Sequence, residues 1–256
     1  MYIDFLGAHN LEAQDSRCVS LLIDDVLAIE AGALTSSLSF KAQQKLEAVL
    51  LTHQHYDHVR DIPAIGMNFS LHKNTISLYA TRPVYDALAA HLLNDSLYPN
   101  FMERPPEKPA IRFKLVEPGK TDTIGGYDVL AVPVNHAVPT VGYQITAPDG
   151  KAVFYTSDTG TGLADCWRQV SPQLLITEVT APNRYEEFAH RSGHLTPGLL
   201  QQELACFREI KGYLPQVVLV HMNPMEEKEI EVEIASVARS LNTAIRLGYE
   251  GMRIHL

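Results

Sequence analysis

The sequence predicts an α/β fold built as an αββα sandwich, in which two mixed β-sheets pack face to face and carry helices on their outer surfaces. Two observations indicate this fold. Short apolar runs typical of strands come first in each half of the chain, and a strand–helix alternation follows them in both halves. With 256 residues, of which 46% are hydrophobic, the chain can also bury a full core without disulfides. We therefore expect residues 1–256 to form a single domain.

The first half is expected to begin with strands and to continue with strands and helices in turn. Asp24-Asp25 separates two apolar runs, as in a tight hairpin turn, and Pro83 suits the first turn of a helix. The expected strands are Tyr2–Leu6, Val19–Ile23, Val26–Ile29, Ala48–Leu51 and Ile76–Ala80, and the expected helices are Asp61–Leu71 and Pro83–Leu93.

The second half repeats this order. Asp149-Gly150 predicts a hairpin, and Thr196-Pro197 is typical of a helix cap and first turn. The expected strands are Ile111–Val116, Tyr127–Val134, Val141–Thr146, Ala152–Tyr155, Leu174–Thr177 and Gln216–Val220, and the expected helices are Gly162–Val170, Pro197–Lys211 and Met225–Leu241. Four prolines within Pro99–Pro109 exclude a regular helix or central strand, so we expect a surface connection between the two halves.

The net negative charge of the chain argues against polyanionic ligands. The chain has 30 acidic and 21 basic residues, a formal charge of −9. Binding to a long polyanion requires a basic face, so we expect no nucleic-acid partner, whereas a small phosphorylated ligand is compatible with this charge.

Three further features concern the compartment in which the protein is expected. No apolar run reaches 18 residues, so we expect no membrane span, and the first residues lack the basic segment of a secretory signal. The cysteines at 18, 166 and 206 are odd in number and widely spaced, which is typical of unpaired thiols. These features predict a cytoplasmic protein.

The segment Thr52–His58 has the composition of a metal site. It contains three histidines and one aspartate within six positions, directly after the apolar run Ala48–Leu51. On an extended segment His53 and His55 point the same way and Asp57 continues that parity, whereas His58 breaks it where the chain turns into a helix. One short stretch can therefore present two separate pairs of ligands.

Three more potential ligands follow apolar strands. His136, Asp158 and His221 come after the strands expected to end at Val134, Tyr155 and Val220. Functional groups gather where strands end and loops begin, so we expect these side chains to join the histidine cluster. Seven ligands on four strand ends are enough for two metal ions.

These residues carry a resemblance to a known family. Thr52–His58 resembles the metal-binding signature of the metallo-β-lactamase fold hydrolases. Four further stretches resemble motifs of the family's phosphodiesterase branch, in the family's order: Phe5-Leu6-Gly7, the H-x-V-P-x-x-G-Y stretch His136–Tyr143, Tyr155–Gly160 and Val218–His221. Together they extend over nearly the whole chain.

The resemblance implies two divalent metal ions. Its ligand assignment gives the first metal to His53, His55 and His136 and the second to Asp57, His58 and His221, with Asp158 as the bridge. The ligand types suit zinc, and manganese or iron can bind the same set. Glu30 stands where the family usually has an aspartate that supports the histidine cluster.

The resemblance also implies catalytic roles. A metal-bridging hydroxide would be the nucleophile, and Asp57 would both ligate and accept the proton of the attacking water. His194 resembles the family's non-ligand histidine and is the expected general acid, and Glu178 resembles the acidic residue that keeps it protonated. Tyr143 and Asn223 border the expected site and are candidates for substrate contact.

Three functions remain open at this point. The preferred one is a phosphodiesterase acting on a small, cyclic nucleotide, with a homodimer as the assembly typical of the family. A transfer-RNA 3′-end endonuclease shares the motifs, but its RNA-gripping arm is often inserted between the positions of His136 and Asp158, where this chain has only a hairpin. A hydrolase of lactones, carboxylic esters or thioesters would not need the His194–Glu178 pair.

Overall fold

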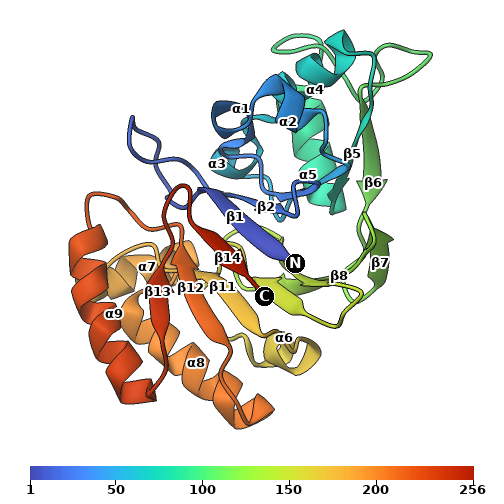
Figure 1. The fold of residues 1–256 in the computed structure, drawn as a ribbon. Helices are drawn as coiled ribbons and strands as arrows, with labels where there is room; N and C mark the ends of the chain where they lie inside the picture. Colours follow the sequence, from blue (N-terminus) through green and yellow to red (C-terminus); the bar gives the residue numbers. More distant parts are fainter.

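The computed structural model describes residues 1–256, and its architecture is two seven-stranded mixed sheets packed face to face with helices on the outer surfaces (Figure 1). The predicted αββα sandwich is therefore confirmed. In each sheet, antiparallel strands on one side give way to parallel strands on the other.

The strands of the first sheet lie in the order β14-β1-β2-β3-β4-β5-β6. Their bounds are β1 (Tyr2–Gly7), β2 (Ser20–Ile23), β3 (Leu27–Ile29), β4 (Ala48–Leu50), β5 (Ile76–Ala80), β6 (Ile111–Leu115) and β14 (Arg253–His255). Asp24 and Asp25 both have positive φ angles, +46° and +64°, so the predicted tight turn joins β2 to β3.

The second sheet has the order β13-β12-β11-β10-β9-β8-β7. Its strands are β7 (Thr121–Ile124), β8 (Tyr127–Val134), β9 (Thr140–Thr146), β10 (Ala152–Tyr155), β11 (Leu174–Glu178), β12 (Gln216–Val220) and β13 (Ile245–Leu247). The predicted Asp149-Gly150 hairpin connects β9 to β10.

The helices cover the outer faces of both sheets (Figure 1). They are α1 (Leu34–Ser37), α2 (Phe40–Gln43), α3 (Tyr56–Val59), α4 (Ile62–Leu71), α5 (Arg82–Ala87), the π-helical turn η1 (Leu88–Leu92), α6 (Ala164–Gln169), the 3₁₀ turn η2 (Asn183–Tyr185), α7 (Glu186–Ser192), α8 (Pro197–Lys211) and α9 (Glu227–Leu241). Thr196 caps α8 as predicted, because its side chain accepts a hydrogen bond from the Leu199 amide. None of these helices combines the length and hydropathy that crossing a membrane requires.

Three apolar clusters correspond to the three interfaces of the sandwich. Alternate residues of one strand serve two of them: in β12, Val218 and Val220 pack between the sheets, whereas Val217 and Leu219 pack under α8 and α9. Both faces of such a strand are buried, which explains why it reads as a continuous apolar run. The third cluster lies between the first sheet and α4.

The structure corrects the predicted division of the chain. The strand after the proline-rich segment, β6, pairs with β5 and so belongs to the first sheet. Pro99–Pro109 therefore connects η1 to β6 within one layer and does not join two halves. Periodicity reveals a strand but not its partner, because pairing is decided by contacts distant in sequence.

Candidate metal centre

The ends of four strands bring the predicted ligands together. β4 ends at Leu50, and the extended residues that follow carry His53 and His55 before α3 begins at Tyr56 and presents Asp57 and His58. β8, β10 and β12 lead in the same way to His136, Asp158 and His221. The predicted change from extended chain to helix is confirmed, but it comes earlier than expected: α3 begins at Tyr56, so Asp57 lies on the helix and not on the extended segment.

Two groups of ligand atoms result, and within each the atoms lie no more than 4.8 Å apart. The groups are His53, His55, His136 and Asp158, and Asp57, His58, Asp158 and His221. Asp158 belongs to both: its Oδ2 lies 3.6 Å from His53 Nε2, 3.3 Å from His58 Nε2 and 3.4 Å from His221 Nε2. This is the position that a bridging carboxylate requires.

The buried polar atoms of the centre fit bound cations. His53 Nε2, His58 Nε2 and Asp158 Oδ1 are buried and have no hydrogen-bond partner of good geometry. A buried polar atom without a partner is costly, and a coordinated cation would satisfy these atoms. The imidazole and carboxylate donors are also those that zinc, manganese or iron accept.

The electrostatics fit metal binding best in the first group of ligands, whereas in the second group the charges of Asp158 and Glu30 outweigh burial and raise the pKa of His58. Burial is the largest cause that lowers the pKa values of His53, His55 and His136, so these imidazoles are held neutral, as ligands must be. Burial alone would raise the pKa of Asp57, but hydrogen bonds and positive charge from His221 and His58 hold it far below its usual range. The carboxylate is therefore ionised.

Hydrogen bonds to the opposite ring nitrogens orient the histidines. His136 Nδ1 donates to the Gly193 carbonyl at 2.8 Å, and His221 Nδ1 lies 2.9 Å from Thr180 Oγ1. Gly193 has φ of +71°, and a Cβ there would lie 2.9 Å from the Ala137 amide nitrogen, so this close approach requires glycine. Both bonds leave Nε2 available to a metal.

Glu30 supports the cluster from behind, although it is longer than the aspartate expected there. Its Oε1 lies 3.1 Å from His58 Nδ1 and accepts a 2.5 Å hydrogen bond from Thr52 Oγ1. Glu30, Ser157 and His221 all have positive φ angles of 62–64°, an unfavourable conformation for residues with a side chain. Such strain tends to cluster at functional sites.

His194 and Glu178 form a hydrogen-bonded pair beside the centre. His194 Nδ1 lies 2.6 Å from Glu178 Oε1, and the ring stacks on that of His221 with centroids 5.4 Å apart. The buried carboxylate also accepts bonds from the Thr159 and Leu195 amides. Burial lowers the pKa of His194, but the charge and hydrogen bond of Glu178 outweigh it and raise the pKa to about 9.

Of the two residues that the sequence offered as substrate contacts, only one lies at a cavity. Tyr143 is fully buried, and its hydroxyl donates to the Leu51 carbonyl, so the expectation that it touches substrate is wrong. Asn223 does line a cavity beside His194. Sequence reasoning missed Thr180, whose hydroxyl donates to Glu178 and contacts His194 and His221. Its place at the end of β11, two residues after Glu178, was the available signal.

Comparisons with known proteins find relatives of this chain. The family model described as "Beta-lactamase superfamily domain" matches residues 21–222. A Ribonuclease Z from Methanopyrus kandleri is 33% identical over 110 residues, 42% of this chain and 34% of the relative. An octanoyltransferase from Porphyromonas gingivalis is 24% identical over 220 residues, 83% of this chain. The chain spans 38% or less of the length of these curated relatives.

Solved structures share the fold. Unliganded yeast PDE1 superposes with a TM-score of 0.86 at 16% identity, covering 100% of this chain and 99% of that one. The short form of human tRNase Z has a TM-score of 0.70 at 18% identity, with 100% and 99% coverage. The family resemblance predicted from the motifs is confirmed.

Proposed function

The chain belongs to the beta-lactamase superfamily of metal-dependent hydrolases, and on this premise we propose that it is a binuclear phosphodiesterase that hydrolyses a small cyclic nucleotide. The observation that carries the proposal is the His194–Glu178 pair, because a protonated imidazole beside the metal ligands supplies what a poor alkoxide leaving group needs.

The family implies divalent cations, and the two ligand groups are the residues that would hold them. His53, His55 and His136 would bind the first cation, Asp57, His58 and His221 the second, and Asp158 both. When bound, such a pair of cations acidifies water and neutralises the charge on phosphoryl oxygens.

The chain's own residues would then move the protons. Asp57 is ionised, which is the form that would accept the proton of an attacking water, and the contacts with His221 and His58 that keep it ionised also make it a weak base. His194 uses Nδ1 to contact Glu178, which leaves Nε2 to donate a proton to the departing oxygen. Thr180 holds these groups in position, since its hydroxyl donates to Glu178 and contacts the rings of His194 and His221.

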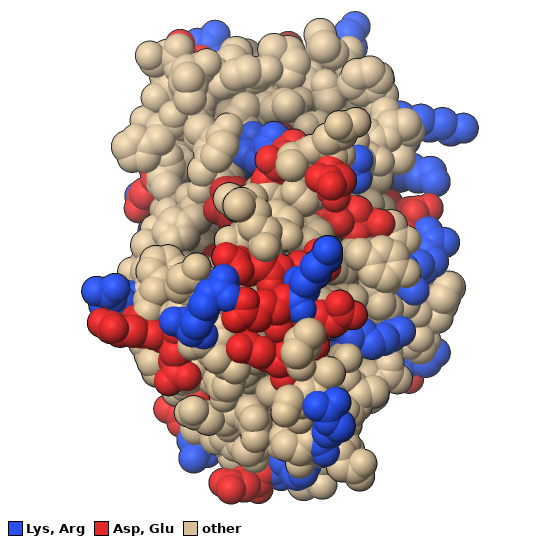
Figure 2. Space-filling model, turned by 90° about the vertical axis from the view of Figure 1, so that its left-hand side faces the viewer, with Lys and Arg blue, Asp and Glu red and all other residues tan.

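Surface charge favours a small substrate over RNA. Figure 2 shows acidic side chains gathered over the middle of the face that carries the β1–β2 connection and the start of α9 in Figure 1. These elements contain Glu12, Asp15, Glu226, Glu227 and Glu229. Glu12 pairs with Arg60, and Glu226 and Glu229 pair with Arg184, so this face offers no excess of basic charge to a polyanion and tolerates a ligand with one phosphodiester charge.

Two alternatives lack comparable support. A transfer-RNA endonuclease of this type would need an RNA-binding arm, and between His136 and Asp158 the structure has only β9, its hairpin and β10. A lactone, ester or thioester hydrolase would not need a protonated His194.

The test is a hydrolysis screen on protein whose metal content has been measured. The substrates are cyclic mono- and dinucleotides, a precursor transfer RNA and a panel of lactones and thioesters. We expect turnover of a cyclic nucleotide that depends on both bound metals. Preferential cleavage of the transfer RNA or of a carboxylic ester would overturn the proposal.

A further inference from the structure

A cavity of about 500 Å³ lies beside His194, and nothing in the proton transfers described above uses it. We propose that it binds the nucleobase of the substrate, with Tyr185 and Phe188 contacting the base. The inference rests on the proposed function and deepens it, because it makes these side chains the determinants of specificity for a nucleoside ester.

The walls of the cavity are unusually apolar for an exposed position. Leu11, Tyr185 and Phe188 line it, and they are 47%, 41% and 52% exposed. They come from two distant parts of the chain, the β1–β2 connection and the η2–α7 segment, yet they surround one hollow. Clustered apolar side chains around a hollow indicate a ligand site, whereas single exposed ones do not.

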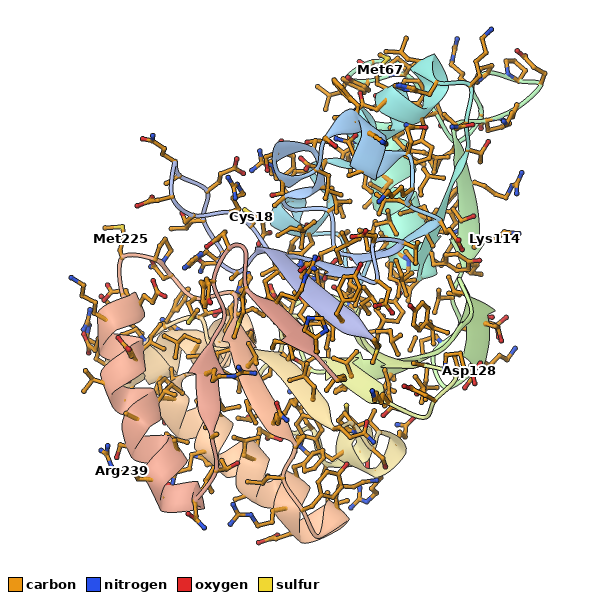
Figure 3. The ribbon with its side chains drawn as sticks, viewed as in Figure 1. Cys18, Met67, Lys114, Asp128, Met225 and Arg239 are labelled. Atoms are coloured by element: carbon orange, nitrogen blue, oxygen red, sulfur yellow. The ribbon has the colours of Figure 1, made fainter.

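The loop after β12 adds another apolar group next to this region. Met225 is 85% exposed, and it projects outward at the tip of the loop that leads into α9 (Figure 3). Its neighbour Glu226 lines the cavity. An apolar rim of this kind suits a planar aromatic ligand better than it suits phosphate or sugar.

Tyr185 is held in place before any ligand binds. The guanidinium of Arg184 lies 4.7 Å from the centre of its ring, and Arg184 is itself paired with Glu226 and Glu229 on the neighbouring segment. The ring is therefore fixed from one side, and a fixed aromatic surface loses little conformational freedom when a base contacts it.

Two asparagines give the cavity hydrogen-bonding groups for the edge of a base. Asn10 Oδ1 is buried and has no hydrogen-bond partner. Asn223 Oδ1 accepts a bond from the Met225 amide at 3.0 Å, and its Nδ2 makes no bond within the chain. One free acceptor and one free donor are the groups with which amide side chains recognise nucleobases.

The position of the cavity matches the geometry of the reaction. His194 and Thr180 are part of its wall, and His194 is the proposed donor to the leaving oxygen. In a nucleoside cyclic phosphate that oxygen stays attached to the ribose, so the base lies on the same side of the phosphorus as the acid. The cavity has His194 in its wall and so lies on the side of the acid.

The experiment compares a nucleoside 3′,5′-cyclic phosphate with the same cyclic phosphate lacking a base, using the metal-loaded protein. For the wild type we expect kcat/KM to be more than tenfold higher for the nucleoside cyclic phosphate than for the cyclic phosphate without a base. In Tyr185→Ala and Phe188→Ala the ratio should fall at least tenfold, mainly through KM. The control is Phe40→Ala, which removes an aromatic ring that is 63% exposed on α2, outside the cavity, and should keep the wild-type ratio.

Binding measurements distinguish failure of the proposed base site from failure of the proposed phosphodiesterase activity. Calorimetry on the metal-loaded protein should give at least tenfold tighter binding for AMP or GMP than for ribose 5-phosphate, and Tyr185→Ala should remove the difference. Equal affinities, or a difference that survives both substitutions, would overturn the base site even if cyclic nucleotides are hydrolysed. Base-dependent binding without phosphodiester hydrolysis would instead keep the site and overturn the function.

Discussion

Replacing Glu178 by Gln tests whether this carboxylate keeps His194 protonated. Glu178 raises the pKa of His194 from 6.5 to about 9, and burial works in the opposite direction. In Glu178→Gln the pKa should therefore fall to 6.5 or below. At pH 8 the protonated fraction drops from about 0.9 to about 0.03 or less, a loss of at least about thirtyfold, whereas at pH 6 the loss is far smaller because the pH is then close to the new pKa.

The assay is the pH dependence of kcat/KM for two substrates. A cyclic nucleotide has a poor leaving group and should show the full loss at pH 8 and a much smaller loss at pH 6. Bis(p-nitrophenyl) phosphate needs little protonation of its leaving group, so its profile should change much less.

Controls separate this effect from other consequences of the substitution. Metal content is measured in each variant, and Glu231→Gln removes the same charge from an exposed position on α9. An equal loss at pH 6 and pH 8, or an equal loss for both substrates, would refute the reasoning about His194.

Three further predictions concern the metals, the acid and the core. Asp158→Ala and His55→Ala should each lose bound divalent metal and all hydrolysis, as measured by elemental analysis and turnover; full metal content in Asp158→Ala would exclude its bridging position. His194→Ala should keep its metals and slow a poor leaving group by roughly 10²–10⁴, with a smaller loss on bis(p-nitrophenyl) phosphate; equal losses on the two substrates would remove the histidine from the acid role. Phe207→Ala, in the fully buried cluster under α8, should lower the free energy of unfolding by about 3–5 kcal/mol in urea titrations. Val232→Ala on the exposed face of α9 should change it by no more than about 0.5 kcal/mol, and similar values for the two variants would contradict the packing described here.

Much of the fold follows from local pattern. The hairpin turns, the cap at Thr196 and the long helices were predicted close to their observed bounds, because turn residues and periodicity act over a few neighbouring positions. The short strands β7, β13 and β14 were missed. β14 consists of only three residues and is a strand because it pairs with β1 from the other end of the chain.

Part of the candidate site could likewise be predicted from local sequence, and part could not. His53, His55, Asp57 and His58 could be predicted as a ligand cluster, since their spacing alone sets which way they point on an extended segment and on the helix that follows. The cavity lined by Leu11 and Tyr185 could not, because its walls come from unrelated segments.

The sequence by itself determined the layered α/β architecture, the six-residue ligand cluster and the strand ends that carry further candidate ligands. Only the tertiary structure decided that β6 belongs to the first sheet, that Tyr143 is buried, and that Asp158 Oδ2 lies between two groups of histidines. The physical reason is the range of the interactions. Side-chain parity and turn chemistry depend on near neighbours, whereas strand pairing and the meeting of ligands at a sheet edge depend on residues that are distant in sequence, 35 positions apart for Ile76 and Ile111 and 105 for His53 and Asp158.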